Sequence, residues 1–142
     1  MSEEARRRYR DYVVLSLEAQ KVTFEAGERE LIGDGIAKFE LDGDVARGIV
    51  SVVATERGQI LGREVAKSML GIMAQLGGRK RAVTKGTFEQ GVKILQGLTK
   101  GHVNEANARA WLKLIIEGSD LPVRGSGLLR RKRWFRKIKP MV

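Results

Sequence analysis

Residues 61–76 read LGREVAKSMLGIMAQL, and this stretch decides the fold class. Its apolar residues recur three and four positions apart, which is the spacing of one face of an α-helix. They are Leu61, Val65, Met69, Ile72, Met73 and Leu76. Gly77 and Gly78 follow directly and are typical of a helix end. The stretch therefore predicts an amphipathic helix that buries one face against other elements.

The same periodicity on both sides predicts further helices. Before this stretch we expect helices over residues 3–23 and 25–39, and a third that starts at Asp42-Gly43-Asp44 and ends near Gly58. Residues 49–54 are β-branched enough to permit a strand, but their flanks have helical spacing. After it, the capping box Thr87-Phe88-Glu89-Gln90 starts a helix that ends at Gly101, and Asn104 caps a last one. The sequence thus predicts an all-α fold, a compact bundle of about six helices.

The length of 142 residues suits one domain. We expect a helical bundle domain over residues 1–123, a short flexible joint at Gly125-Ser126-Gly127, and a basic C-terminal arm over residues 124–142. No internal repeat is evident. Three glycines, Gly48, Gly71 and Gly91, fall inside predicted helices, where close helix crossings explain them.

Composition excludes several classes of function. The chain has no cysteine and one histidine, His102, so disulfides, thiolate nucleophiles and multi-histidine metal sites are impossible. The longest uncharged stretch, residues 68–78, falls far short of the roughly 20 residues that cross a bilayer. The start of the chain, MSEEARRRYR, lacks the apolar region of a secretory signal, so a cytoplasmic location is expected. We expect a binding protein and not an enzyme, with no cofactor.

The net charge of +10 is unevenly distributed along the chain. Residues 1–56 hold 8 Lys/Arg and 12 Asp/Glu, and residues 57–123 hold 11 and 5. Residues 124–142 hold 8 Lys/Arg and no acid. Most of the excess positive charge therefore lies in the arm.

The arm interleaves cations with two aromatic residues, a pattern typical of nucleic-acid binding. Cations neutralise phosphates and release counterions, while aromatic rings stack on unpaired bases. The predicted binding residues in the arm are Arg124, Arg130, Arg131, Lys132, Arg133, Trp134, Phe135, Arg136, Lys137 and Lys139. We expect Trp134→Ala and Phe135→Ala to weaken single-strand binding with little change in stability.

Two further basic clusters could extend this footprint. Arg79, Lys80 and Arg81 follow the residue 61–76 stretch and belong to the predicted binding set. Residues 6–10 read RRRYR and form the second cluster. Several clusters in one small chain strengthen the prediction of a polyanion partner, with DNA or RNA as the first choice.

Two other partners fit the arm. Wound as a helix, the arm could lie on an anionic membrane surface, with Leu128, Phe135 and Ile138 toward the lipid. Alternatively its apolar residues dock onto the body of the protein or onto an acidic partner in a larger assembly, and its cations are solvated. Nucleic acid ranks first, an acidic protein partner second and the membrane surface third.

Residues 19–31, AQKVTFEAGEREL, followed by Phe39-Glu40-Leu41-Asp42 and Ala46-Arg47, resemble the opening of TerB-like helical domains. In that family a helix is followed by a V-S/T-x-E-E start and later by a turn into the next helix. The resemblance implies a helical bundle that acts as an interaction module. Because Gln20-Lys21 stand where the family has an acidic pair, its metal association is not carried over.

Overall fold

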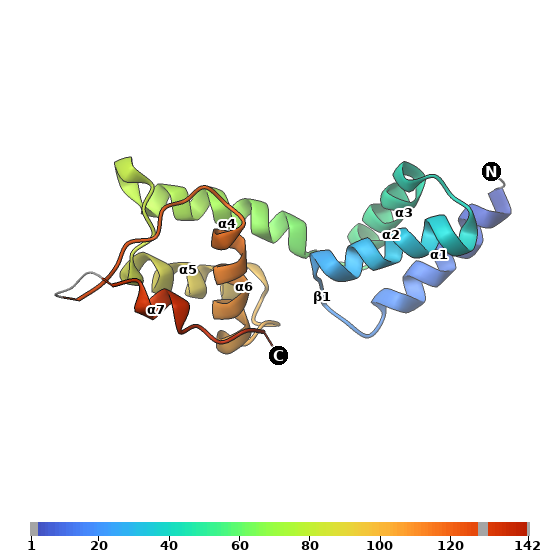
Figure 1. The fold of residues 1–142 in the computed structure, drawn as a ribbon. Coiled ribbons are helices and arrows are strands. Elements are labelled where there is room, and N and C mark those ends of the chain that lie inside the picture. The colour runs from blue at the N-terminus through green and yellow to red at the C-terminus, as the bar shows by residue number, and fades with distance from the viewer. Residues whose placement is uncertain (1–2, 128–130, 142) are drawn as a thin grey trace. The chain divides into compact units, whose positions relative to one another are not determined.

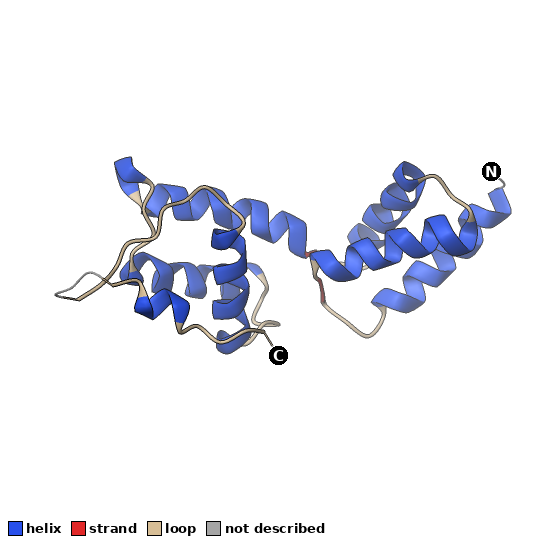
Figure 2. Ribbon diagram, in the orientation of Figure 1, coloured by secondary structure: helices blue, strands red, loops and turns tan. Residues whose placement is uncertain are grey.

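The computed structural model describes residues 3–127 and 131–141, and it confirms the all-α fold. Six of the seven helices in this part of the chain have seven residues or more (Figure 2). The helices are α1 (Glu3–Leu17), α2 (Glu25–Phe39), α3 (Gly43–Glu56), α4 (Gly62–Leu76), α5 (Lys85–Leu98), α6 (Glu105–Glu117) and α7 (Arg133–Arg136). A 3-10 turn, η1 (Gly78–Lys80), and two short strands, β1 (Val22–Thr23) and β2 (Ile60–Leu61), complete the elements. The β-branched residues 49–54 lie in α3, as predicted.

The chain divides into two compact units, residues 1–63 (unit 1) and 64–142 (unit 2). This differs from the predicted boundary at residue 123. The described part of the predicted arm belongs to unit 2, where Phe135 is buried with only 8% of its surface exposed. Burying an apolar side chain of the arm against the preceding helices thus lowers the free energy of the chain more than leaving it in a solvated tail.

Unit 1 is a three-helix bundle in which α1, α2 and α3 share one core (Figure 1). The core side chains are Tyr9, Val13, Leu17, Leu31, Leu41, Ala46, Val50, Val53 and Ala54. The Tyr9 hydroxyl donates a hydrogen bond of 2.6 Å to the Leu31 carbonyl oxygen. Gly35 is needed beside this ring, because a Cβ there would lie 2.8 Å from the Tyr9 ring and 2.9 Å from the Ala46 Cβ.

The first helix is shorter than predicted and ends at Leu17, not at Thr23. Val22 and Thr23 instead form β1 and pair in parallel with Ile60 and Leu61 of β2. Gln59 supports this pairing, since its side-chain amide donates to the Leu17 carbonyl at 2.9 Å. The partner strand lies far away in the sequence, beyond α2 and α3, so helical periodicity could not reveal it.

The buried phenol of Tyr9 predicts a loss of stability at high pH. Desolvation, with a smaller contribution from the charge of Asp34, raises the pKa of Tyr9 from 10.0 to about 12. A group whose pKa is raised by folding contributes full stability below its unfolded pKa, so unit 1 should lose roughly 2 kcal/mol between pH 10 and pH 12. Urea unfolding followed by circular dichroism should show a larger loss in the wild type than in Tyr9→Phe, which keeps only the contribution of Tyr12, whose pKa is raised by its hydrogen bond to Asp34. Parallel pH profiles for the two proteins would contradict the prediction.

Unit 2 is built from α4, α5 and α6, against which α7 is packed. Gly91 allows the close approach of these helices, because a Cβ there would lie 2.9 Å from Leu112 Cδ2 and even closer to the Met73 sulfur. The α5 cap is Thr84, whose hydroxyl accepts from the Thr87 backbone N–H at 3.1 Å, so the helix starts earlier than the predicted capping box. Asn104 caps α6 as predicted, accepting from the Asn107 N–H at 2.8 Å.

The predictions for the three glycines inside helices have mixed outcomes. A close helix crossing is confirmed at Gly91 but is wrong for Gly48 and Gly71, where a Cβ would meet nothing within 4 Å. Trp111 is a core residue, 5% exposed, and His102 is exposed.

Unit 2 repeats the element order of unit 1, although no repeat is evident in the sequence. Each unit has a long helix, then an extended segment, then two helices. After the last of these helices the chain pairs in parallel with the extended segment. The pairs are β1 with β2 in unit 1 and Val83 with Val123 in unit 2. The buried positions also correspond. Ala46, Val50, Val53 and Ala54 of α3 have the same spacing as Ala108, Leu112, Ile115 and Ile116 of α6. Glu28, Leu31 and Gly35 of α2 likewise have the same spacing as Phe88, Gly91 and Leu95 of α5.

Candidate polyanion-binding surface

Dividing the chain at residue 63 sharpens the charge asymmetry. Unit 1 holds 10 Lys/Arg and 12 Asp/Glu, a formal charge of −2, whereas unit 2 holds 17 and 5, a formal charge of +12. All of the net positive charge therefore belongs to unit 2. Unit 2 is therefore the unit that attracts a polyanion electrostatically.

Backbone pairing attaches the start of the arm to unit 2. The Val83 N–H donates to the Pro122 carbonyl at 2.7 Å, and the Arg124 N–H donates to the Val83 carbonyl at 2.8 Å. The Ser126 N–H then donates to the Arg131 carbonyl at 3.0 Å. The central residue of the predicted flexible joint at residues 125–127 is thus itself hydrogen-bonded.

The two aromatic residues of the arm pack into unit 2. The Phe135 ring contacts the buried Phe88 ring edge to face, with centroids 6.1 Å apart, and Lys113 Nζ lies 5.7 Å from the Phe135 centroid. Trp134 packs against both phenylalanines, and its Nε1 donates to the Arg124 carbonyl at 3.0 Å. The first-ranked prediction exposes Phe135 to bases, but the ring is buried in the core of the unit, as the alternative of docking onto the body predicts. Trp134 is half-buried, with part of its surface exposed.

The cations of the arm surround the packed rings of Trp134 and Phe135 and are exposed to solvent. The exposed residues are Arg124, Arg131, Lys132, Arg133, Arg136, Lys137 and Lys139. Within the described part of the chain, none of them forms an ion pair with an Asp or Glu. Arg130, also predicted to bind, lies outside the described residues. The arm therefore carries positive charge that no described acidic residue compensates, and it is held on unit 2 by its packed aromatic rings.

The predicted basic cluster that follows α4 lies partly beside the arm. Arg79, Lys80 and Arg81 are all exposed in and after η1, and Arg81 pairs with Asp120 at 3.5 Å. Lys80 and Arg124 line one hollow of about 530 Å³, together with Thr84 and residues 125–127. The structure thus brings a cation of this cluster and a cation of the arm together. The cluster at residues 6–10 belongs to unit 1.

A second hollow, of about 370 Å³, lies at the far end of the arm. Trp134, Ile138 and Pro140 give it an apolar side, and Lys137, Lys139 and Arg109 give it charge. Arg109 is already engaged by Glu89 of α5 and by Glu105 one turn earlier in its own helix, and its hydrogen bond holds the pKa of Glu89 below the usual value. Lys137 and Lys139 are thus the cations here that remain for a ligand. We call these two lysines, Lys80 and the other exposed arm cations the basic surface.

Sequence reasoning missed two residues that line the hollows beside this surface, Thr84 and Asn107. Thr84 lines the hollow beside Lys80, and Asn107 lines the one beside Trp134. Neither carries a local signal of binding, since both positions depend on the long-range pairing of Val83 with Val123 and on the docking of α7.

No family model, curated protein or solved structure matches the chain. The resemblance to TerB-like domains therefore stays a prediction. None of the helices in residues 3–127 and 131–141 is both long and apolar enough to cross a bilayer.

Proposed function

We propose that the protein acts by binding a polyanion, most directly DNA or RNA, through the basic surface of unit 2. The observation that carries the proposal is the set of arm cations. They are exposed, they lack acidic partners among the described residues, and they surround the packed rings of Trp134 and Phe135. Such cations can neutralise phosphates without first breaking ion pairs. Because Trp134 and Phe135 hold the segment in place, less conformational entropy is lost on binding than for a free tail.

The recognition expected from this surface is backbone contact with little base readout. Lysine and arginine side chains meet phosphates in any sequence, and base selectivity requires side chains that reach base edges. The half-exposed Trp134 beside Lys137 is the one aromatic surface in the described part of the arm that is available to stack on a base. Any preference for single strands should therefore depend on Trp134.

The burial of Phe135 favours nucleic acid over the membrane alternative. A helix on a lipid surface would need Phe135 and Ile138 on its apolar side facing the acyl chains. Phe135 is instead occupied by Phe88 and Lys113. The cations remain free for phosphates, while much of the apolar surface required for insertion is used inside the unit.

A charge-removal variant tests this proposal. Replacing Arg131, Lys132 and Arg133 by glutamine should lower affinity for a DNA duplex on the order of tenfold to a hundredfold at low salt, and should reduce the salt slope by about 2 to 3. The control removes three exposed cations of unit 1, as Lys21→Gln, Arg29→Gln and Arg57→Gln. Fluorescence anisotropy with DNA, RNA and vesicles of acidic phospholipid, titrated with salt, measures both quantities.

The control separates surface binding from bulk charge. Both triple variants change the net charge equally, so equal losses of affinity would overturn the proposal. No salt-dependent affinity of the wild type for either nucleic acid would also overturn it, and binding to acidic vesicles alone would restore the membrane alternative.

A further inference from the structure

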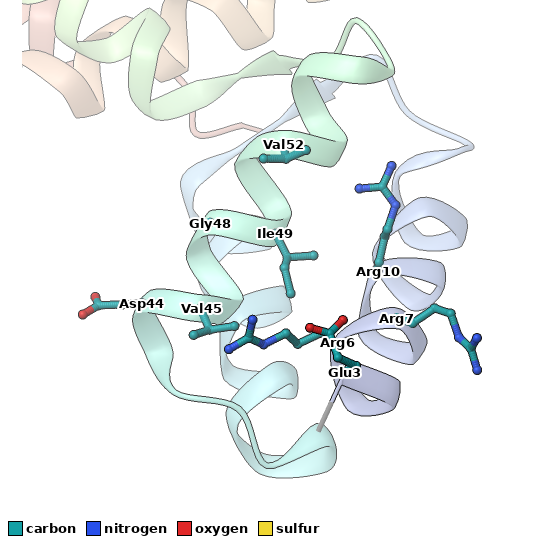
Figure 3. Close-up of a pocket in the computed structure, with 9 residues that line it drawn as sticks. All are labelled: Glu3, Arg6, Arg7, Arg10, Asp44, Val45, Gly48, Ile49 and Val52. Atoms are coloured by element: carbon teal, nitrogen blue, oxygen red, sulfur yellow. The ribbon is translucent and has the colours of Figure 1, made fainter. Parts of the chain in front are cut away.

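An open groove runs between α1 and α3 of unit 1 (Figure 3). Its floor on α3 is apolar and consists of Val45, Gly48, Ile49 and Val52, and its volume is about 590 Å³. Val52 is 50% exposed, and a Cβ at Gly48 would meet nothing within 4 Å. The groove is therefore an apolar hollow that this unit does not fill.

Arginines of α1 line the opposite wall of the groove. Arg10 is paired with Glu56, and among the acidic lining residues Asp44 is paired with Arg47. Arg6 and Arg7 form no ion pair with any described Asp or Glu, and Glu3 lies at the same wall. In Figure 3 the side chain of Arg6 extends toward Val45, whereas that of Arg7 lies at the outer edge of the wall and points away from α3. The wall thus has a local excess of positive charge in a unit whose formal charge is −2.

Comparison with unit 2 indicates what the groove lacks. The alignment that matches the buried positions of α3 with those of α6 places Gly48 opposite Ala110 and Ile49 opposite Trp111. Ala110 and Trp111 are 2% and 5% exposed. Unit 2 therefore buries its own tryptophan at the position where unit 1 has a smaller, half-buried isoleucine beside a glycine.

We propose that the α1–α3 groove is a docking site for an acidic amphipathic helix of a partner protein. A large apolar side chain of that helix fills the space over Gly48 and Ile49, and its carboxylates face Arg6 and Arg7. Val45, Ile49 and Val52 cover two turns of α3, a length of about 10 Å that a short helix can follow side by side. The arginines select an acidic partner over a basic one, which is the role expected for charges at the edge of an apolar groove.

The groove is distinct from the basic surface, and its ligand differs in kind. Phosphates need cations alone, whereas this site pairs two cations with an apolar floor. The proposal rests on unit 1 and stands or falls separately from nucleic-acid binding by unit 2.

Three synthetic peptides test the proposal with the full chain. The probe is a fluorescein-labelled peptide with Trp, Leu and Leu at positions i, i+4 and i+7 and glutamate at most other positions. One control peptide replaces each glutamate by lysine, and the other keeps glutamate and replaces the apolar residues by alanine. All measurements use the background of Arg131→Gln, Lys132→Gln and Arg133→Gln, which suppresses attraction to unit 2. Only the first peptide should bind with substantial affinity.

Variants of the groove locate the binding. Gly48→Trp fills the groove and should weaken binding at least about tenfold, whereas Gly33→Trp, at another open glycine of unit 1 outside the groove, should leave it unchanged. Val52→Glu, at a half-exposed position, should also weaken binding without affecting the fold. Arg6→Glu with Arg7→Glu should reverse the preference between the acidic and basic peptides.

Several outcomes would overturn the proposal. Equal binding by Gly48→Trp and Gly33→Trp would place the peptide elsewhere, as would equal affinity for the acidic and basic peptides. If Gly48→Trp changes the sedimentation of the protein alone and leaves peptide affinity intact, the occupant is a second copy of this chain.

Discussion

Replacing Phe135 with alanine should destabilise unit 2 by about 3 to 4 kcal/mol, because the ring is a core residue supplied from the end of the chain. The substitution removes the edge-to-face contact with Phe88 and the contact with Lys113, and it leaves a cavity beside a fully buried ring. The expectation from the sequence was a small change in stability, which the burial of Phe135 overturns.

The chain offers a unit-specific signal for this measurement. Both tryptophans, Trp111 and Trp134, lie in unit 2, so tryptophan fluorescence during urea unfolding reports on that unit. Trp134→Ala should cost less, since this ring is only half-buried. Phe135→Leu, which keeps much of the apolar volume, should recover part of the loss. A free energy of unfolding unchanged in Phe135→Ala would mean that the arm is not part of the core.

Replacing Arg63 with methionine should destabilise unit 1 by about 2 to 4 kcal/mol, because it leaves the carboxylate of Glu28 buried without its cation. The Glu28 side chain is 7% exposed, and its Oε1 accepts from Arg63 Nε at 2.8 Å. Arg63 also donates to the Ser51 hydroxyl at 3.0 Å. Since 39% of the Arg63 side chain is exposed, we expect a loss toward the lower end of the range for buried pairs.

A second substitution isolates the cause. Phe88 of unit 2 corresponds to Glu28, so an apolar residue is accepted at this position of the repeat. Glu28→Leu combined with Arg63→Met should therefore regain most of the lost stability. Both tyrosines, Tyr9 and Tyr12, lie in unit 1 and supply its signal by absorbance. Arg57→Met is the control for loss of an exposed arginine. If the double variant is less stable than Arg63→Met, burial of the unpaired carboxylate is not the cause.

Helical periodicity predicted most of the helices because it reflects local side-chain spacing. The prediction for residues 61–76 matches α4 to within one residue, and the Asn104 cap of α6 is confirmed. The errors lie where distant segments meet. Residues 18–23 had helical spacing but leave the helix, since Val22 and Thr23 pair with Ile60 and Leu61.

The site was predictable in its charge and not in its aromatic residues. The cations of the arm are evident from composition, and those in the described part are exposed as a binding role requires. Whether Trp134 and Phe135 face solvent or a core depends on the partner surface, here Phe88 of α5, which lies far earlier in the chain. A short aromatic and basic segment has the same pattern in both cases.

The amino-acid sequence by itself determined the all-α class, most helix positions and the concentration of positive charge toward the C-terminus, because each depends on composition or on neighbours within a few turns. Only the tertiary structure decided that the chain forms two similarly ordered units, that the arm belongs to the second, and that Phe135 is a core residue. These properties depend on contacts between residues far apart in the sequence, such as Val83 with Val123. The same is true of the α1–α3 groove, which exists because Gly48 and Ile49 leave open a space beside α1, a helix from a distant part of the sequence.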